Sequence, residues 1–195
     1  MAIPRRALLS VAMLGTRATF AAPADLARTE RSLGSSEAGK TATEYFSLTC
    51  PHCAAFAQQS LPELKAKWIT PGKLRFIFFD FPTDQTALQA AMVARYIAPE
   101  QYERFIDTLF ERQARWAFGG GNVANALWPL ASEAGMDRMT FERSLGDTAL
   151  KEWIVGRALD AQSRWHVSAT PSFMINGKLY AGAISADEFA IILGS

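Results

Sequence analysis

Cysteine and histidine are scarce in this sequence of 195 residues, which contains two of each. A zinc site takes three or four protein ligands, and no second cysteine pair accompanies Cys50 and Cys53. A c-type haem site needs a histidine directly after the second cysteine, where this sequence has Ala54. We therefore expect neither a metal nor a bound cofactor.

An excess of charge of one sign is also lacking, because 20 Lys and Arg against 19 Asp and Glu give a formal net charge of +1. Such a balance does not point to nucleic acid or to an acidic membrane surface as a partner. No repeat or low-complexity tract is visible, and a content of 49% hydrophobic and 20% charged residues is ordinary for a globular protein. The length suits one domain with an insertion, and we expect a monomer.

The N-terminus has the three parts of a secretory signal. Arg5 and Arg6 precede an apolar run, Ala7 to Gly15, which is too short to span a bilayer. Ala22-Pro23-Ala24 has the small-residue pattern of a cleavage site. We expect residues 1–24 to be a cleaved signal peptide and the remaining chain to act in an oxidising compartment.

One residue departs from the signal pattern. Arg17 lies where the apolar part of a signal peptide should continue. Whether Arg17 impairs export therefore stays open, and an N-terminus without a targeting function is the alternative.

Hydrophobic periodicity predicts two strands with a helix between them. Thr41–Ser47 alternates and carries β-branched and aromatic residues, although it is polar for a central strand. Lys73–Phe81 is a dense apolar run, which favours a buried strand. Ala54–Ile69 has helical spacing, and Pro62 either kinks this helix or ends it, with Ser60 capping a second helix.

The rest of the chain is predicted to be mostly helical, with a hairpin near its end. Asn176-Gly177 is a strong hairpin signal, because both positions of this two-residue turn need a positive φ. The remaining elements that we expect are a polar linker at 25–40, helices at 87–97, 100–116, 123–134, 138–145 and 148–165, strands at 171–175 and 178–181, and a last helix from Ser185.

Cys50-Pro51-His52-Cys53 stands between the first predicted strand and the following helix. Free backbone N–H groups and the positive end of the helix would stabilise a thiolate at Cys50. Pro51 suits the first helical position, because its missing N–H costs nothing there. Cys53 follows about one turn later on the same face, which permits a disulfide. His52, as a cation or as a hydrogen-bond donor, would also favour a thiolate nearby.

A disulfide within this segment would be a poor structural staple. It would close about four residues and restrain the unfolded chain by only about 2 kcal/mol. A stabilised thiolate, in contrast, is a good leaving group, and it favours the reduced protein, so that the disulfide form is a stronger oxidant. A cysteine pair without a function is the alternative, and the position between strand and helix disfavours it. We therefore expect a redox couple.

Four segments resemble the DsbA-like family of bacterial disulfide oxidoreductases, which have a thioredoxin fold. CPHC is the active-site sequence of DsbA itself, and its combination with a distant Thr-Pro-x-Phe-x-x-Asn-Gly is specific. The likeness covers roughly residues 26–195 and implies an α/β, thioredoxin-like domain at 25–195 with a helical insertion at about 83–165. The segments are Glu44–Cys53, Phe76–Pro82, Thr170–Lys178 and Thr29–Gly34.

The resemblance also implies roles for individual residues. Cys50 would be the exposed nucleophile that forms the mixed disulfide, and Cys53 would be the buried resolving thiol. Pro171 would be cis and face the disulfide, with the backbone of Thr170 binding the substrate chain; an ordinary trans proline is the alternative. Glu44 would lie under the disulfide and relay protons, since burial raises a carboxyl pKa. The alternative for Glu44 is a solvated carboxylate at a strand edge.

The function implied by the resemblance is disulfide transfer to reduced or unfolded exported proteins in the periplasm. A membrane partner similar to DsbB and linked to quinone would reoxidise the Cys50–Cys53 pair. A reductase or isomerase on the same fold is the first alternative, and Thr170 before Pro171 is more typical of isomerase-like members. A chaperone-like binder of unfolded exported chains, without catalysis, is the second. Neither the reduction potential nor the identity of substrates and redox partner follows from the sequence.

Overall fold

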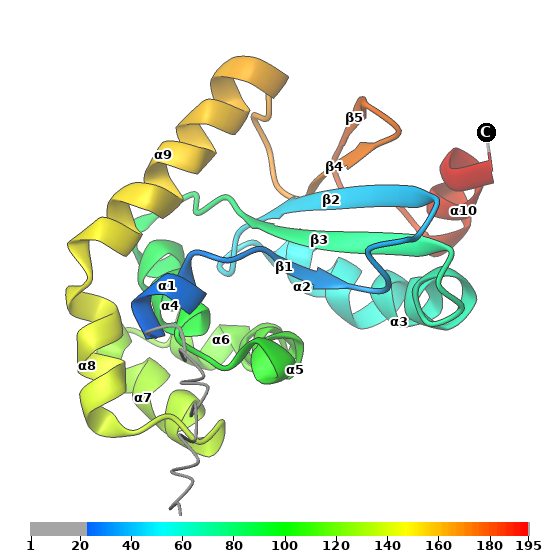
Figure 1. The fold of residues 1–195 in the computed structure, drawn as a ribbon. Helices are drawn as coiled ribbons and strands as arrows, with labels where there is room; N and C mark the ends of the chain where they lie inside the picture. Colours follow the sequence, from blue (N-terminus) through cyan, green and yellow to red (C-terminus); the bar gives the residue numbers. More distant parts are fainter. Residues whose placement is uncertain (1–22, 195) are drawn as a thin grey trace, which may run out of the picture.

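The computed structural model describes residues 23–194, and five strands form one sheet within them (Figure 1). The strand order is β1-β3-β2-β4-β5. β2 and β3 are parallel, and every other neighbouring pair is antiparallel. The strands are β1 (Arg31–Leu33), β2 (Lys40–Phe46), β3 (Leu74–Asp80), β4 (Ser172–Ile175) and β5 (Lys178–Ala181).

Helices surround this sheet, so the predicted α/β fold class is confirmed. In Figure 1, α2, α3 and α10 lie along one face of the sheet, and α4 to α8 gather beside one of its ends. Within residues 23–194, no helix is long and apolar enough to cross a membrane. The helices are α1 (Pro23–Ala27), α2 (Pro51–Ala55), α3 (Leu61–Leu64), α4 (Gln85–Arg95), α5 (Pro99–Glu111), α6 (Gln113–Trp116), α7 (Val123–Glu133), α8 (Arg138–Gly146), α9 (Thr148–Trp165) and α10 (Ala186–Gly194).

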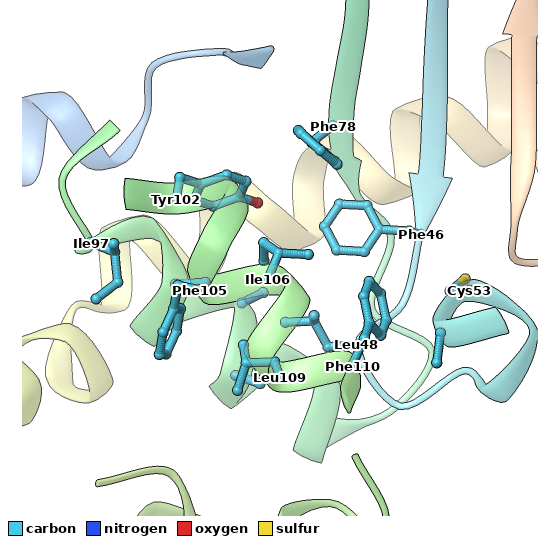
Figure 2. Packing of buried hydrophobic residues seen from close by; sticks show 14 of the residues in the cluster. Phe46, Leu48, Cys53, Phe78, Ile97, Tyr102, Phe105, Ile106, Leu109 and Phe110 are labelled. Carbon is cyan, nitrogen blue, oxygen red and sulfur yellow. The ribbon is translucent and has the colours of Figure 1, made fainter. Parts of the chain in front are cut away.

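The helices inserted between β3 and β4 share one core with the sheet. Figure 2 shows the apolar side chains of α5 facing Phe46 of β2 and Phe78 of β3. The ring of Phe46 lies 6.1 Å from the ring of Phe78 and 6.1 Å from that of Phe110 on α5. Because protein interiors are close-packed, this contact fixes the position of the inserted helices relative to the strands.

The predicted linker at residues 25–40 is wrong, because part of it is strand β1. Arg31 pairs with Phe78 and Leu33 with Phe76 at the outer edge of the sheet. Three residues are too few to show a period of two, and Arg31 and Ser32 are polar. The strand forms because β3 offers it a free edge.

Of the two alternatives at Pro62, the one in which the helix ends and restarts is wrong, and the kink stays a prediction. Residues 51–69 stay helical throughout, with π-helical turns at Phe56–Ser60 and Lys65–Ile69 on either side of α3. A π-turn changes the hydrogen-bond register and so accommodates the N–H that proline lacks. Ser60 makes no capping bond, and its Oγ donates to the carbonyl of Ile184 at 3.3 Å instead.

The hairpin turn agrees with its prediction, whereas the predicted helix at 100–116 is divided. Asn176 and Gly177 have φ of 51° and 76°, as the hairpin turn requires. The predicted helix at 100–116 is two helices, because the backbone of Arg112 (φ −103°, ψ 14°) ends α5. The predicted signal peptide lies outside the described residues except for Pro23 and Ala24, which begin α1.

Candidate active site

Cys50 stands between β2 and α2, as the sequence predicted. It is the N-cap residue of α2, with φ −79° and ψ 119°, and Pro51 occupies the start of the helix. The backbone N–H of Cys50 donates to the carbonyl of Ser47 at 3.0 Å, and Ala54 donates to the carbonyl of Cys50 at 3.2 Å. Cys50 is half-buried, whereas Pro51 and His52 are exposed. The turn therefore presents the Cys50 sulfur at the surface, at the positive end of a helix.

Cys53 lies one turn further along α2 and is fully buried, with 0% of its surface exposed. Both cysteines are free thiols, and the Cys53 thiol donates a hydrogen bond to the Cys50 sulfur. Within residues 23–194, no group of three or more His, Cys, Asp or Glu side chains could hold a metal ion. Of the two cysteines, only Cys50 is accessible to a reactant in solution, because Cys53 is fully buried.

The two thiols differ strongly in acidity. The pKa of Cys50 is lowered to about 5, mainly by the hydrogen bond from the Cys53 thiol, against the effect of burial. The side chain of Thr170 and the backbone N–H groups of Cys53 and His52 lower this pKa further. Burial, and then the hydrogen bond to Cys50, raise the pKa of Cys53. At neutral pH, Cys50 is therefore a thiolate and Cys53 keeps its proton.

The loop before β4 completes the site. The peptide bond between Thr170 and Pro171 is cis, so the alternative of a trans proline is wrong. Pro171 is buried, and the Cys50 sulfur lies 3.2 Å from the carbonyl oxygen of Thr170, to which it donates when it is protonated. These residues are 120 positions apart in the sequence. The structure thereby brings together Cys50 and the two residues predicted to bind the substrate chain.

Glu44 is buried, with 2% of its surface exposed, so the alternative of a solvated strand-edge carboxylate is wrong. It lies on β2 between Phe78 of β3 and Phe173 of β4. Burial, and then the charge of Cys50, raise the pKa of Glu44 well above its usual value, which confirms the expected direction. Its Oε1 has no hydrogen-bond partner in the part of the chain that the structure describes. The proton-relay role itself stays a prediction.

A network of hydroxyl groups, which the sequence analysis missed, supports the turn before Cys50. Ser47 Oγ lies 3.2 Å from Thr49 Oγ1 and 2.9 Å from Thr83 Oγ1. Thr49 Oγ1 donates to Asp84 Oδ2 at 2.6 Å, and Asp84 also caps α4 by accepting from the backbone N–H of Ala87. Only the capping role of Asp84 has a local sequence signal.

A family model described as thioredoxin matches residues 26–194. The chain belongs to this thioredoxin family. Among solved structures, alpha-DsbA1 of Wolbachia pipientis is 27% identical with a TM-score of 0.79, over 86% of this chain and 90% of that chain. BdbD from Bacillus subtilis, at 21% identity and a TM-score of 0.75 over 85% of this chain and 91% of that chain, shows the same fold. The resemblance to DsbA proteins is thus confirmed.

Curated relatives of this thioredoxin-family chain carry names from disulfide chemistry. The "Putative protein-disulfide oxidoreductase" of Rickettsia felis is 27% identical over 159 residues, which are 81% of this chain and 56% of the relative. The "Probable disulfide bond formation protein D" of Bacillus cereus is 27% identical over 161 residues, with 77% of this chain and 72% of the relative covered. The chain spans a little over half the length of the rickettsial relatives that it matches.

The lowered pKa of Cys50 predicts a pH dependence of the stability of the reduced protein. Because its folded pKa of about 5 lies below the ordinary value of 9.0, the thiolate stabilises the folded reduced form. This contribution is lost as the pH falls through the folded pKa. We therefore expect the free energy of unfolding of the reduced form, minus that of the disulfide form, to fall steadily from about pH 8 to about pH 5.

Denaturant unfolding of both redox forms at each pH measures this difference. The disulfide form is the control, because it lacks the two thiols and shares all other titrating groups. A difference that stays constant over this range would contradict the lowered pKa of Cys50.

Proposed function

We propose that this chain is a thiol:disulfide oxidoreductase that donates its Cys50–Cys53 disulfide to other proteins. The observation that carries the proposal is the contrast between the two thiols, one accessible with a pKa of about 5 and the other buried with a raised pKa. Such a contrast separates an attacking sulfur from a resolving sulfur. The names of the curated relatives support the same chemistry.

The transfer proceeds in two exchanges. A substrate thiolate attacks the sulfur of Cys50 in the disulfide form, the Cys50–Cys53 bond breaks, and Cys53 leaves and takes up a proton. A second substrate thiolate then attacks the substrate sulfur of the mixed disulfide and releases Cys50 as a thiolate. The substrate loses two electrons and gains a disulfide, and the enzyme gains both electrons as a dithiol.

The residues around the sulfur atoms have distinct tasks in this scheme. Cys50 is a good leaving group in the second exchange because its thiolate is stabilised. The buried carboxyl of Glu44, with its raised pKa, supplies the proton that Cys53 needs in the first exchange. The backbone of Thr170 and cis-Pro171, beside the Cys50 sulfur, holds the substrate chain by hydrogen bonds.

The setting of the reaction is also part of the proposal. The signal-like N-terminus supports a place in the periplasm, where the substrates are reduced or unfolded exported chains. The reduced enzyme needs an external oxidant, and a membrane partner similar to DsbB fills this role. The chain acts as a monomer.

The redox equilibrium of the purified chain against a series of glutathione buffers tests the direction of transfer. We expect the chain to be the stronger oxidant, because a stabilised Cys50 thiolate favours the reduced form. Each tenfold change in the equilibrium constant corresponds to about 30 mV. A disulfide more stable than that of glutathione would instead support a reductase on the same fold.

A further inference from the structure

Gln113 is the first residue of α6, within the inserted helices, and only 7% of its surface is exposed. A side-chain hydrogen bond joins α6 to α5, because the indole N–H of Trp116 donates to the carbonyl of Leu109 on α5 at 2.7 Å. Trp116 is itself buried. A buried side-chain amide is normally hydrogen-bonded, so the partners of Gln113 show which part of the chain it positions.

Both partners of the Gln113 side-chain nitrogen belong to the turn that precedes α2. Gln113 Nε2 donates to the carbonyl of Leu48 at 2.8 Å and to the carbonyl of Cys50 at 3.1 Å. The two acceptors are 65 and 63 residues away in the sequence. Both hydrogens of one NH₂ group are thus used to fix two carbonyls on either side of Thr49.

The carbonyl of Cys50 has a second task, since it accepts the first backbone hydrogen bond of α2 from Ala54 at 3.2 Å. Its direction therefore sets the plane of the peptide that joins Cys50 to the helix. The same first turn directs the backbone N–H groups of His52 and Cys53 toward the Cys50 sulfur, where they lower its pKa. A change in the direction of this carbonyl would turn the donors away from the sulfur.

The NH₂ group of Gln113 also affects the Cys50 thiolate electrostatically. A carbonyl oxygen carries a partial negative charge, which disfavours a thiolate, and the carbonyls of Leu48 and Cys50 belong to the same turn as the Cys50 sulfur. The NH₂ group of Gln113 offsets this effect on both oxygens. Without it, two carbonyls of a buried turn would also lose a donor, which is costly in itself.

We propose that Gln113 is a positioning residue for Cys50, which holds the turn Leu48–Cys50 so that the N-terminus of α2 faces the reactive sulfur. Through this one side chain, the inserted helices adjust the reactivity of a nucleophile that lies outside them. The proposal deepens the proposed function and rests on it only for the consequence that exchange at Cys50 becomes slower without Gln113.

The test is a titration of the Cys50 thiolate, followed by its ultraviolet absorbance in the reduced protein. In Gln113→Met, which keeps the length of the side chain and removes its donors, we expect the midpoint to rise by about half a unit to one unit. Ser144→Ala is the matched control, because Ser144 is buried in the same helical region and its Oγ donates to Phe141 at 2.7 Å. The control should lose a comparable hydrogen bond and keep the parental midpoint.

A folded Gln113→Met protein with an unchanged midpoint would overturn the proposal, whatever its thermal stability. If this variant does not fold, the unmodified protein gives the answer by NMR. The side-chain amide resonances of Gln113 should shift with the same midpoint as the Cys50 absorbance, because coupling between two groups is reciprocal. Resonances that stay constant through that midpoint would refute the proposal.

These readouts do not depend on turnover, so they separate the two proposals. A normal thiolate titration in a chain that transfers no disulfide would reject the proposed function and leave the role of Gln113 to be decided by the variant. A chain that transfers disulfides, but whose Cys50 titration is the same with and without the Gln113 side chain, would support the proposed function and reject the role of Gln113.

Discussion

Replacing Cys50 by Ser is expected to abolish disulfide transfer to a reduced substrate protein. A serine hydroxyl forms no disulfide, and Cys53 cannot take over, because it is fully buried and its pKa is raised. The recovery of activity by a reduced, unfolded substrate protein in a glutathione buffer, with the parent chain or the variant added, measures this transfer. We expect the rate to fall to that of the uncatalysed reaction.

Cys53→Ser is the matched variant. It keeps the accessible Cys50 thiolate, so it should form a mixed disulfide with oxidised glutathione that persists for lack of a resolving thiol. Cys50→Ser should form none. Equal trapping by both variants would show that the two thiols are not divided into an attacking and a resolving sulfur.

The same Cys50→Ser variant separates catalysis from binding. A chaperone-like binder of unfolded chains would suppress the aggregation of a denatured protein equally well without Cys50. If the unmodified chain transfers no disulfide and the Cys50→Ser variant still suppresses aggregation, the chaperone-like binder is favoured. If the unmodified chain transfers disulfides and the variant does not, the oxidoreductase is supported.

A second large effect is expected from Asp80→Asn, on stability rather than on chemistry. Asp80 ends β3 and accepts a hydrogen bond from Arg95 Nε of α4 at 2.5 Å, and the two side chains are 3% and 0% exposed. Arg31 of β1 is also buried beside them, and burial, followed by the charge of Arg95, lowers its pKa. Asp80 is thus the ion-pair partner of Arg95, and its charge, like that of Glu100, also raises the pKa of Arg31.

Because the asparagine side chain carries no charge, Arg95 would remain in the interior of this variant without its ion-pair partner, and Arg31 would lose one of the carboxylates that raise its pKa. Breaking a buried ion pair in this way costs about 3–5 kcal/mol. For a chain of this size, such a loss lowers Tm by about 6 to 20 °C. Thermal unfolding followed by circular dichroism measures the change.

Glu133→Gln is the control for the Asp80 variant. Glu133 pairs with Arg112 at 2.6 Å, but both side chains are exposed, at 59% and 40%. Water screens such a pair, and its loss should change stability by about 1 kcal/mol or less. An equal effect of the two substitutions would mean that burial of the Asp80–Arg95 pair does not set its contribution.

Much of the site could be predicted because its signals are local. The start of α2 follows from Pro51 behind an extended Cys50, and the hairpin follows from Asn176-Gly177. Ser185 and Glu188 cap the N-terminus of α10 reciprocally, with bonds of 2.9 and 3.2 Å. Each of these features depends on residues within four positions of one another, so a short window of sequence contains its cause.

The short strand β1 and the burial of Glu44 could not be predicted in this way. Arg31 and Ser32 look like residues of a solvated linker until the free edge of β3 is in place. On local signals alone Glu44 is a strand-edge residue, and β2 becomes a central strand only when β4, which arrives some 130 positions later in the chain, pairs along its second edge. In both cases a distant segment decides whether a polar residue is in water or in the interior.

By itself, then, the sequence determined the redox pair, its place at a helix N-terminus and the α/β class, since these depend on residue type and short-range periodicity. Only the tertiary structure decided that Thr170, Gln113 and Glu44 surround Cys50 and Cys53, and that Asp80 compensates Arg95. The physical reason is distance along the chain. A hydrogen bond such as that from Gln113 to Cys50 joins residues 63 positions apart, and no local preference of either residue encodes it.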